Sequence, residues 1–413
     1  MKQLFAKILY FFRSERTSKY LVEIAFFCLS LCVFLFLAAS DVVGNVFGTI
    51  VGFLFSTVLL YIIKVVFNSF EDLIKINYNT EQLLKLYRGD PSYRKELRYG
   101  NTSCTFAYAD RLINNGQTFE VVDDPEKTFS PDDFVMENYS TIFSAHSNST
   151  KFNGTTIRLD RFEEENGHCK FYLSRSTVFH HLVTNRAIDY ILFDNVTLRD
   201  MYEYGPLLNP LEESKMSNHI GINALVFLSD GRLLVPRRKK DSTVSKNRVT
   251  SSIAVKLDFP AGKRVVDTEH LMRGTIIDNL GARLNLSRDQ LNLDQIEIDF
   301  LGFGQNIYEG GKPQFYYAVR LTDIDTAAYF KLCEGRAGTV GLDIDRLIYV
   351  ADYESFRFYK GDLRFSAIDP ATGKRKRASV HTKCEMSYLC NLWHYEQQKH
   401  ADSAAQQGAG NDT

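Results

Sequence analysis

Two long apolar runs near the amino terminus constrain this chain more than any other feature. The first spans Tyr20–Ser40 with Glu23 as its one charged residue, and the second spans Val46–Phe67 with Lys64 as its one charged residue. A helix of roughly 20 apolar residues crosses a bilayer core about 30 Å thick and satisfies its own backbone hydrogen bonds there. The two runs therefore predict a transmembrane helical hairpin over residues 20–67.

The residues around the runs predict how the hairpin is oriented. The connector Asp41–Asn45 is short and polar, so the two helices are expected to run antiparallel. Five lysines and arginines precede the first run and none lies in the connector. By the positive-inside rule, both ends of the chain then lie in the cytoplasm. Two alternatives are a cleaved signal peptide, whose apolar region of about 7 to 15 residues is shorter, and buried core helices of a soluble domain.

The two charged residues of the hairpin suggest a membrane-coupling pair. Counted outward from Val43, in the middle of the connector, Glu23 and Lys64 lie at similar depth. Charges near a bilayer tend to find partners, so one hypothesis is an ion pair that fixes the helices against each other. The alternative is two independent side chains that extend to the membrane surface.

Composition limits the class of the rest of the chain. A net charge of −1 over 413 residues gives no attraction of the whole chain to nucleic acid, so any anion site must be local. Seven cysteines without metal-ligand spacing, two of them in the first run, indicate free thiols in a reducing cytoplasm. Several Asn-x-Ser/Thr triplets support the opposite interpretation, a glycosylated extracellular face.

Changes in composition divide the chain into segments. The predicted order is a cytoplasmic segment at 1–19, the hairpin at 20–67, a stalk helix at 68–92, a β-rich extension with helices at 93–216, a sensor domain at 217–399 and a disordered tail at 400–413. Whether 93–216 is a separate domain stays open. In this segment a helix is expected over Ser176–Phe193, with His180 and His181 packed or solvated and not bound to a metal.

The segment 217–399 shows an ordered series of elements. Two strands joined by Asp230-Gly231 predict a hairpin, because Asp-Gly is a favoured two-residue turn. Gly281 is expected to end the following helix as its C-cap. The predicted elements are strands at 222–229, 232–237 and 250–257, a helix at 268–280, strands at 295–303 and 314–321, a helix at 324–334, a hairpin, and a final helix at 384–398.

This order of strand, turn, strand, strand, helix and strand resembles the Nudix hydrolase fold, a Nudix-like α/β/α domain. In that family the helix carries a box of glutamates that bind the divalent metal activating water. Aligned on Gly281, the box positions are occupied by Gly274, Thr275, Asp278 and Asn279, so three of the four lack a metal-binding carboxylate. Asp278 and the upstream Glu269 are the candidate metal ligands, and the resemblance therefore implies a Nudix fold with a degenerate hydrolytic box.

The whole chain resembles the SMODS-associated Nudix effectors of bacterial cyclic-oligonucleotide anti-phage signalling (CBASS). The resemblance lies in two apolar spans followed by a degenerate Nudix-like domain that contains the segment Asn218–Ala254. It implies a membrane-anchored α+β protein of the bacterial inner membrane that needs no cofactor. It also implies an activating cyclic di- or oligonucleotide, a partner nucleotidyltransferase that makes this ligand, oligomerisation and disruption of the lipid bilayer.

A basic loop supplies the candidate ligand-binding residues. In the Nudix fold this loop lies over the substrate cleft, and arginine and lysine donate charge-assisted hydrogen bonds to phosphate. Tyr308 and the run Phe315–Tyr317 add aromatic faces that stack on bases, and 374–377 is a second basic cluster. The candidates are Arg237, Arg238, Lys239, Lys240, Lys246, Arg248, Ser251, Ser252 and Tyr308.

Three functions are consistent with these features. The leading hypothesis is a membrane effector that binds a cyclic nucleotide and has no catalytic step. The second is a membrane-tethered, Mg²⁺-dependent Nudix hydrolase of a nucleoside diphosphate derivative, with Glu269 and Asp278 on the metal. The third is an interaction protein whose inactive Nudix fold binds a protein partner.

Overall fold

The structure is a computed structural model, and it describes most of the chain beyond residue 74. The described residues are 75–114, 116–144, 152–192, 196–238, 248–257, 268–286, 288–334, 344–369, 372–381, 383–394 and 396–397. The chain divides into two compact units. The first comprises 1–77, 132–151 and 182–202, and the second comprises 78–131, 152–181 and 203–413.

The first unit is helical in its described residues. Its helices are α5 (Asp133–Glu137), α6 (Tyr139–Ser144), η2 (Asn185–Ala187) and α8 (Leu198–Tyr202). Val135, Ile142 and Leu198 are fully buried in its apolar core. A buried ion pair adds to this core, because Arg199 donates to the two carboxylate oxygens of Asp189 over 2.6 and 3.0 Å.

A mixed sheet dominates the second unit. Within the described residues it has eleven strands, and its central strands β6 and β10 are parallel. β6 and β7 form the hairpin predicted at Asp230-Gly231. The strands are β1 (Arg94–Tyr99), β2 (Thr102–Ile113), β9 (Ile296–Asn306), β10 (Lys312–Leu321), β6 (Gly221–Leu228), β7 (Leu233–Arg238), β11 (Ile344–Ala351), β13 (Asp362–Ile368) and β12 (Arg357–Tyr359) in spatial order, with β8 (Ile253–Lys256) on β6 and β14 (Arg375–His381) on β13.

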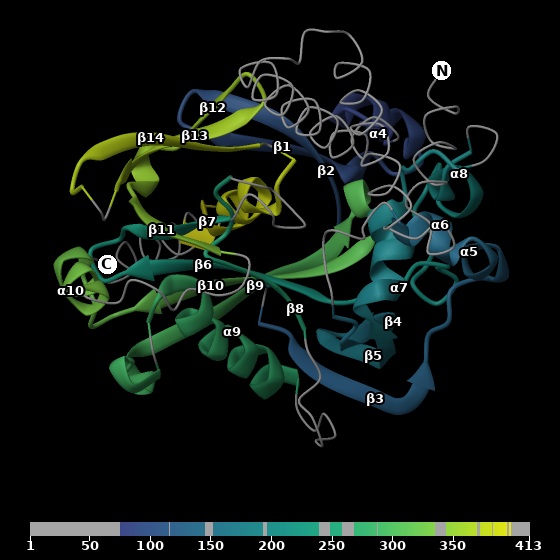
Figure 1. Cartoon of the computed structure of the whole chain (residues 1–413), viewed down its shortest axis with the longest axis horizontal. Coiled ribbons are helices and arrows are strands. Elements are labelled where there is room, and N and C mark those ends of the chain that lie inside the picture. The colour runs from purple at the N-terminus through teal and green to yellow at the C-terminus, as the bar shows by residue number, and fades with distance from the viewer. Residues whose placement is uncertain are drawn as a thin grey trace, which may run out of the picture. The chain divides into compact units, whose positions relative to one another are not determined.

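The sheet has two buried faces, as alternation along β6 requires. Ile222 and Val226 belong to the core on one face, and Leu225 and Phe227 belong to the core on the other. Helix α9 (Thr268–Leu284) packs on the first face, and the helical residues 385–394 pack on the second (Figure 1). The central strands are therefore covered on both sides, which fits their almost continuous apolar sequence.

Helix α9 buries an apolar stripe with a spacing of four residues. Met272, Ile276, Leu280 and Leu284 are all buried in the first core. The prediction that Gly281 ends this helix is wrong, because α9 continues to Leu284. A glycine inside a helix costs about 1 kcal/mol relative to alanine, whereas burial of a leucine side chain contributes about 1.5 to 3 kcal/mol. The packing of Leu284 therefore outweighs the glycine.

A smaller sheet completes the second unit. It has the order β3 (Thr118–Thr128), β5 (His168–Thr177), β4 (Thr155–Glu165), and its buried residues Ile157 and Phe171 join the same core as α9. Strand β2 from the predicted extension pairs with β9, so the extension and the segment 217–399 share one large sheet. The other helices are α4 (Thr80–Leu86), η1 (Pro91–Tyr93), α7 (Val178–Val183), η4 (Arg288–Gln290), η5 (Leu293–Gln295), η6 (Ile307–Glu309), α10 (Thr326–Cys333) and η7 (Tyr353–Ser355).

The predicted membrane anchor requires a correction. Among the described residues, no helix combines the length and the apolar character needed to cross a membrane. The longest of them, α9, has 17 residues and includes Arg273, Asp278 and Arg283, and 17 residues rise only about 25 Å against a core of about 30 Å. The hairpin 20–67, with Glu23 and Lys64, lies outside the described residues. The fold class is corrected to α+β, and the expected pore formation and inner-membrane location are corrected with it.

Candidate functional site

The described part of the basic loop begins at the end of β7. Arg237 and Arg238 are the last residues of that strand, and both are half-buried. The backbone N–H of Arg238 donates to the carbonyl of Arg248 over 2.9 Å. Arg237 also forms an isolated bridge with Val249, so the chain returns alongside β7. Three of the predicted cations therefore lie together, while Lys239, Lys240 and Lys246 lie outside the described residues.

The second basic cluster of the sequence lies within electrostatic range of the first. Lys376 of β14 pairs with the buried carboxylate of Asp369, whose hydrogen bond and charge raise the pKa of Lys376, and Arg237 opposes this increase through its own charge. Burial lowers the pKa of His381, and the nearby charges of Lys383 and Arg248 lower it further. These repulsive interactions place cations from distant parts of the sequence within electrostatic range of one another.

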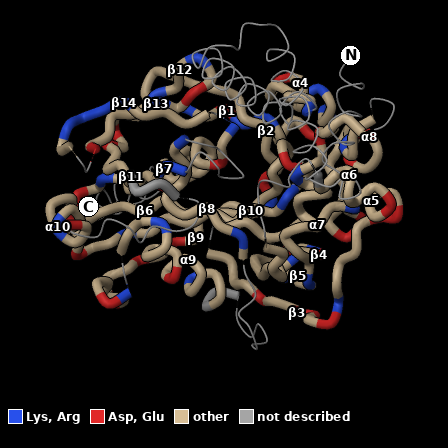
Figure 2. The backbone as a smooth tube through the Cα atoms, in the orientation of Figure 1, with Lys and Arg blue, Asp and Glu red and all other residues tan. Residues whose placement is uncertain are grey.

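We refer to Arg237, Arg238, Arg248, Lys376 and Lys383 as the basic cluster. Its members come from the end of β7, from the strand that returns beside it, and from β14 with the residues that follow. Figure 2 shows this concentration of lysine and arginine positions along β14. Arg237 and Lys376 belong to separate basic segments of the sequence, and the strand order β7, β11, β13, β14 places them in one sheet.

A buried polar group adjoins the basic cluster. Glu385 accepts hydrogen bonds from Asn306 Nδ2 over 2.8 Å and from Gln314 Nε2 over 3.3 Å. Asn223 Nδ2 donates in turn to Gln314 Oε1 over 2.9 Å. Burial raises the pKa of Glu385 and the charge of Glu309 raises it further, whereas Lys312 opposes the increase. This environment therefore penalises the ionised form of Glu385 relative to a glutamate in water.

Gly221 and Cys384 are close to this polar group in the structure or in the sequence. A Cβ atom at Gly221 would overlap the side-chain amide of Gln314, so any larger residue there would displace that amide. Cys384, the residue before Glu385, is in electrostatic contact with Arg238. Burial raises the pKa of the Cys384 thiol to about 12, so this cysteine is neutral and is not a reactive nucleophile.

The predicted hydroxyl and aromatic residues have mixed environments. Ser252 Oγ donates to the carbonyl of Leu234 over 2.5 Å and accepts from the N–H of Val226, which connects β6 and β7 to the segment just before β8. Ser251 is also buried, and its Oγ has no hydrogen-bond partner in the described part of the chain. Tyr308 is near the basic cluster, because the Lys383 ammonium lies 5.8 Å from its ring centroid.

The hydroxyl of Tyr308 has a structural role. It shares a hydrogen bond of 2.8 Å with Thr80 and accepts the N–H of Ala107 over 3.2 Å, which joins α4 to β2. Burial raises the pKa of Tyr308 to about 12. Only its ring is therefore placed to face a ligand next to Lys383.

Of the two candidate metal ligands on α9, Asp278 is the one whose side chain the structure describes. The side chain of Asp278 is 68% exposed and lies 3.5 Å from the guanidinium of Arg288. Glu269 lies on α9 by its backbone, but its side chain lies outside the described residues. Among the residues that the structure describes, no group of three His, Cys, Asp or Glu side chains is placed to hold a metal ion.

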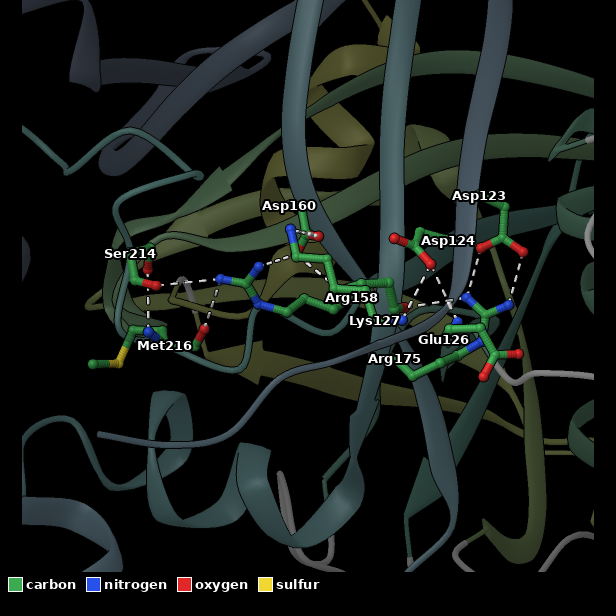
Figure 3. A network of polar contacts seen from close by, with 10 residues as sticks. Asp123, Asp124, Glu126, Lys127, Arg158, Asp160, Arg175, Ser214 and Met216 are labelled. Atoms are coloured by element: carbon green, nitrogen blue, oxygen red, sulfur yellow. Dashed lines mark hydrogen bonds and ion pairs between the residues drawn. The ribbon is translucent and has the colours of Figure 1, made fainter. Parts of the chain in front are cut away.

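A second charged region was missed by the sequence analysis. It joins the smaller sheet to residues 214–216 (Figure 3). Arg158, Asp160 and Arg175 are its buried residues, and the side chain of Asp123 is only 6% exposed. Arg175 donates to both oxygens of Asp123 over 2.6 and 2.7 Å, and Arg158 pairs with Asp160 and donates to the carbonyl of Ser214. In the sequence these residues belong to alternating strand patterns, where their pairing across the sheet cannot be seen.

Comparisons with known proteins give little further information. No protein family matches the chain, and no curated protein sequence matches it. Solved structures match part of it, among them the crystal structure of DR0079 from Deinococcus radiodurans. That match has 16% sequence identity and a TM-score of 0.19, and it covers 26% of this chain and 63% of the other. A likeness this low carries no argument about fold or function.

Proposed function

We propose that this protein binds a phosphate-rich nucleotide and that the basic cluster holds its phosphates. The observation that carries the proposal is the convergence of like charges, with Arg237 acting on Lys376 and Lys383 and Arg248 acting on His381. Clustered cations repel one another, and an anion bound between them relieves that repulsion. Arginine in particular forms paired hydrogen bonds with phosphate oxygens.

The polar group next to the basic cluster indicates that the ligand carries hydrogen-bonding groups in addition to its phosphates. Glu385, Asn306 and Gln314 together offer donors and acceptors, and Asn306 and Gln314 are buried. Nucleobase edges carry the same mixture of donors and acceptors. Binding without hydrolysis is favoured, because Asp278 is exposed, lies next to Arg288 and is not grouped with other carboxylates of the described residues.

The proposed ligand is a cyclic di- or oligonucleotide, as the resemblance to the Nudix effectors implies. Such a ligand carries several phosphodiesters at fixed spacing, which matches cations contributed by separate strands. A nucleotidyltransferase that makes the ligand is the corresponding partner. In this proposal the output of binding is a conformational or oligomeric change, and it requires that the ligand binds one state more tightly than the other.

Calorimetric titration of the full-length protein tests the proposal. The ligands are cyclic di-AMP, cyclic di-GMP and a cyclic trinucleotide, with linear dinucleotides and inorganic phosphate as comparisons. The variant Arg237→Gln/Lys376→Gln is expected to weaken binding of the recognised ligand about tenfold or more, because hydrogen bonds to charged groups contribute about 1.5 to 3 kcal/mol. Arg288→Gln, an exposed arginine on η4, is the matched control. Absence of binding to any of these ligands, or equal affinity of both variants, would refute the proposal.

A further inference from the structure

A pocket with aromatic walls lies on the α9 side of the sheet in the second unit. Its volume is about 820 Å³, within the range of about 300 to 1,000 Å³ that small-molecule sites occupy. Met272 and Arg273 of α9, Phe300 of β9 and Phe119 of β3 are among the residues that line it. The basic cluster is separate, since Arg237, Arg238, Arg248, Lys376 and Lys383 are absent from this lining.

Aromatic rings form the walls and the back of this pocket. The rings of Phe119 and Phe300 meet edge to face with centroids 5.1 Å apart, and Phe300 and Tyr317 are 5.5 Å apart. Phe171, Phe315 and Tyr317 are buried, whereas 38% of Phe119 is exposed. The pocket thus has a fixed aromatic back and an accessible ring at its edge.

The charged residues that line the pocket favour an anion. Arg273 Nη1 donates to the carbonyl of Ile298 over 3.3 Å, and no carboxylate of the described residues lies within ion-pair distance of Arg273. Glu120, the acidic residue of the lining, is already paired with His168 over 3.1 Å and Lys170 over 3.2 Å. Aromatic cages also bind cations, but here the lining offers a guanidinium and no unpaired carboxylate among the described residues.

We infer that this pocket binds a small planar aromatic anion, with its ring against Phe119 and Phe300 and its anionic group at Arg273. Aromatic faces and edges stabilise a planar ring in offset or edge-to-face contact. The guanidinium provides charge-assisted donors for a carboxylate or a phosphate. Both an aromatic carboxylate and a nucleoside monophosphate have this chemistry, and they are the two sources that the experiment separates.

The test is calorimetric titration of the full chain with indole-3-acetate and with AMP. Indole and adenosine lack the anionic group, whereas acetate and ribose 5-phosphate lack the ring. All titrations are repeated in the Arg237→Gln/Lys376→Gln variant, which removes cations of the basic cluster and leaves the pocket intact. Binding of one or both aromatic anions in this variant, at least tenfold more tightly than either kind of fragment, is the expected result.

Two pocket variants complete the test. Arg273→Gln is expected to weaken binding about tenfold or more, and Phe119→Ala is expected to weaken it roughly five- to a hundredfold. Because Phe119 is partly exposed, its removal should leave the urea midpoint nearly unchanged, which separates lost binding from lost folding. Arg288→Gln is the control and keeps full affinity. Binding of neither probe, or affinity that survives both pocket variants, would overturn the inference without affecting the proposal for the basic cluster.

Discussion

Two charged regions of the second unit are built in opposite ways. In the network of Figure 3, buried arginines lie against carboxylates, and the Arg175–Asp123 side chains are only 7% and 6% exposed. In the basic cluster, cations lie close enough to repel one another, and they occur at the ends of strands and in the returning loop. The first region has a counter-charge for each of its buried arginines, whereas the second gathers several cations near the Lys376–Asp369 ion pair.

The difference separates a structural role from a binding role. A buried ion is several kcal/mol less stable than in water unless a partner compensates it, so the Figure 3 residues depend on each other. Cations that repel one another instead reduce the stability of the folded chain slightly and increase its affinity for an anion. The same operation, removal of one positive charge, should therefore affect folding in the first region and binding in the second.

The largest expected effect is the loss of one partner in the buried network. Arg175→Met leaves Asp123 without its two hydrogen bonds, and the free energy of unfolding should fall by about 3 to 5 kcal/mol. The double variant Arg175→Met/Asp123→Leu removes both charges and should recover most of this loss, because well-packed apolar residues often replace a buried ion pair without penalty. Urea unfolding measures both. Equal destabilisation by the single and the double variant would contradict the interpretation of a mutually dependent pair.

The next largest effect is expected when Arg248 of the basic cluster is replaced. Arg248→Gln should weaken nucleotide binding by about 1.5 to 3 kcal/mol and change the free energy of unfolding by less than about 0.5 kcal/mol. Because each phosphate contact releases counterions, the dependence of affinity on salt should also become shallower. Titration at several salt concentrations, together with urea unfolding, gives both quantities. A loss of stability comparable to that of Arg175→Met would place Arg248 with the structural charges.

A smaller effect concerns the response of the Figure 3 network to acid. Burial raises the pKa of Asp160, but hydrogen bonds from Lys127 and Ser174 and the charge of Arg158 outweigh it, so the pKa lies below its ordinary value. Ionised Asp160 therefore stabilises the folded state fully above the pKa of aspartate in the unfolded chain, about 3.9. This contribution to the free energy of unfolding is lost as the pH falls from that value through the lower pKa of the folded state. For one such group, the free energy of unfolding changes by at most about 1.4 kcal/mol per pH unit.

Replacement of Asp160 isolates that response. The Asp160→Asn variant should be less stable at neutral pH and should lose less stability than the wild type when the pH is lowered from 5 to 3. Urea unfolding at each pH measures the difference. Parallel stability curves for the two proteins would show that Asp160 does not contribute to the acid response.

The sequence predicts the elements of the sensor segment better than it predicts their contacts. The predicted strand 222–229 is β6 (Gly221–Leu228), the predicted helix 324–334 contains α10 (Thr326–Cys333), and the Asp-Gly hairpin is confirmed. These features follow from local alternation, caps and turn residues, which neighbouring residues determine. The error at Gly281 arose where burial of Leu284 outweighed a local signal.

The candidate site shows the same limit at longer range. Composition and loop position selected Arg237, Arg238 and Arg248, but the sequence gives no indication that Lys376 lies beside Arg237 or that Glu385 bonds Asn306. Those contacts depend on strand order across the sheet, in which β7, β11 and β13 are neighbours although their residues are far apart. The burial of Ser252 on the strand side of the loop likewise follows from packing and not from its hydroxyl.

The smallest expected effect comes from a charge pair that belongs to neither region. Asp278 and Arg288 are paired at 3.5 Å, but their side chains are 68% and 72% exposed. Water and salt screen such a pair, so Asp278→Asn should change the free energy of unfolding by less than about 0.5 kcal/mol. Since Asp278 was also the candidate metal ligand, the same variant should leave nucleotide affinity unchanged with and without Mg²⁺. A Mg²⁺-dependent loss of binding or of diphosphate hydrolysis in Asp278→Asn would instead give this exposed carboxylate a role in a metal site. In that case, the presence of an ion-pair partner would no longer distinguish structural charged residues from functional ones.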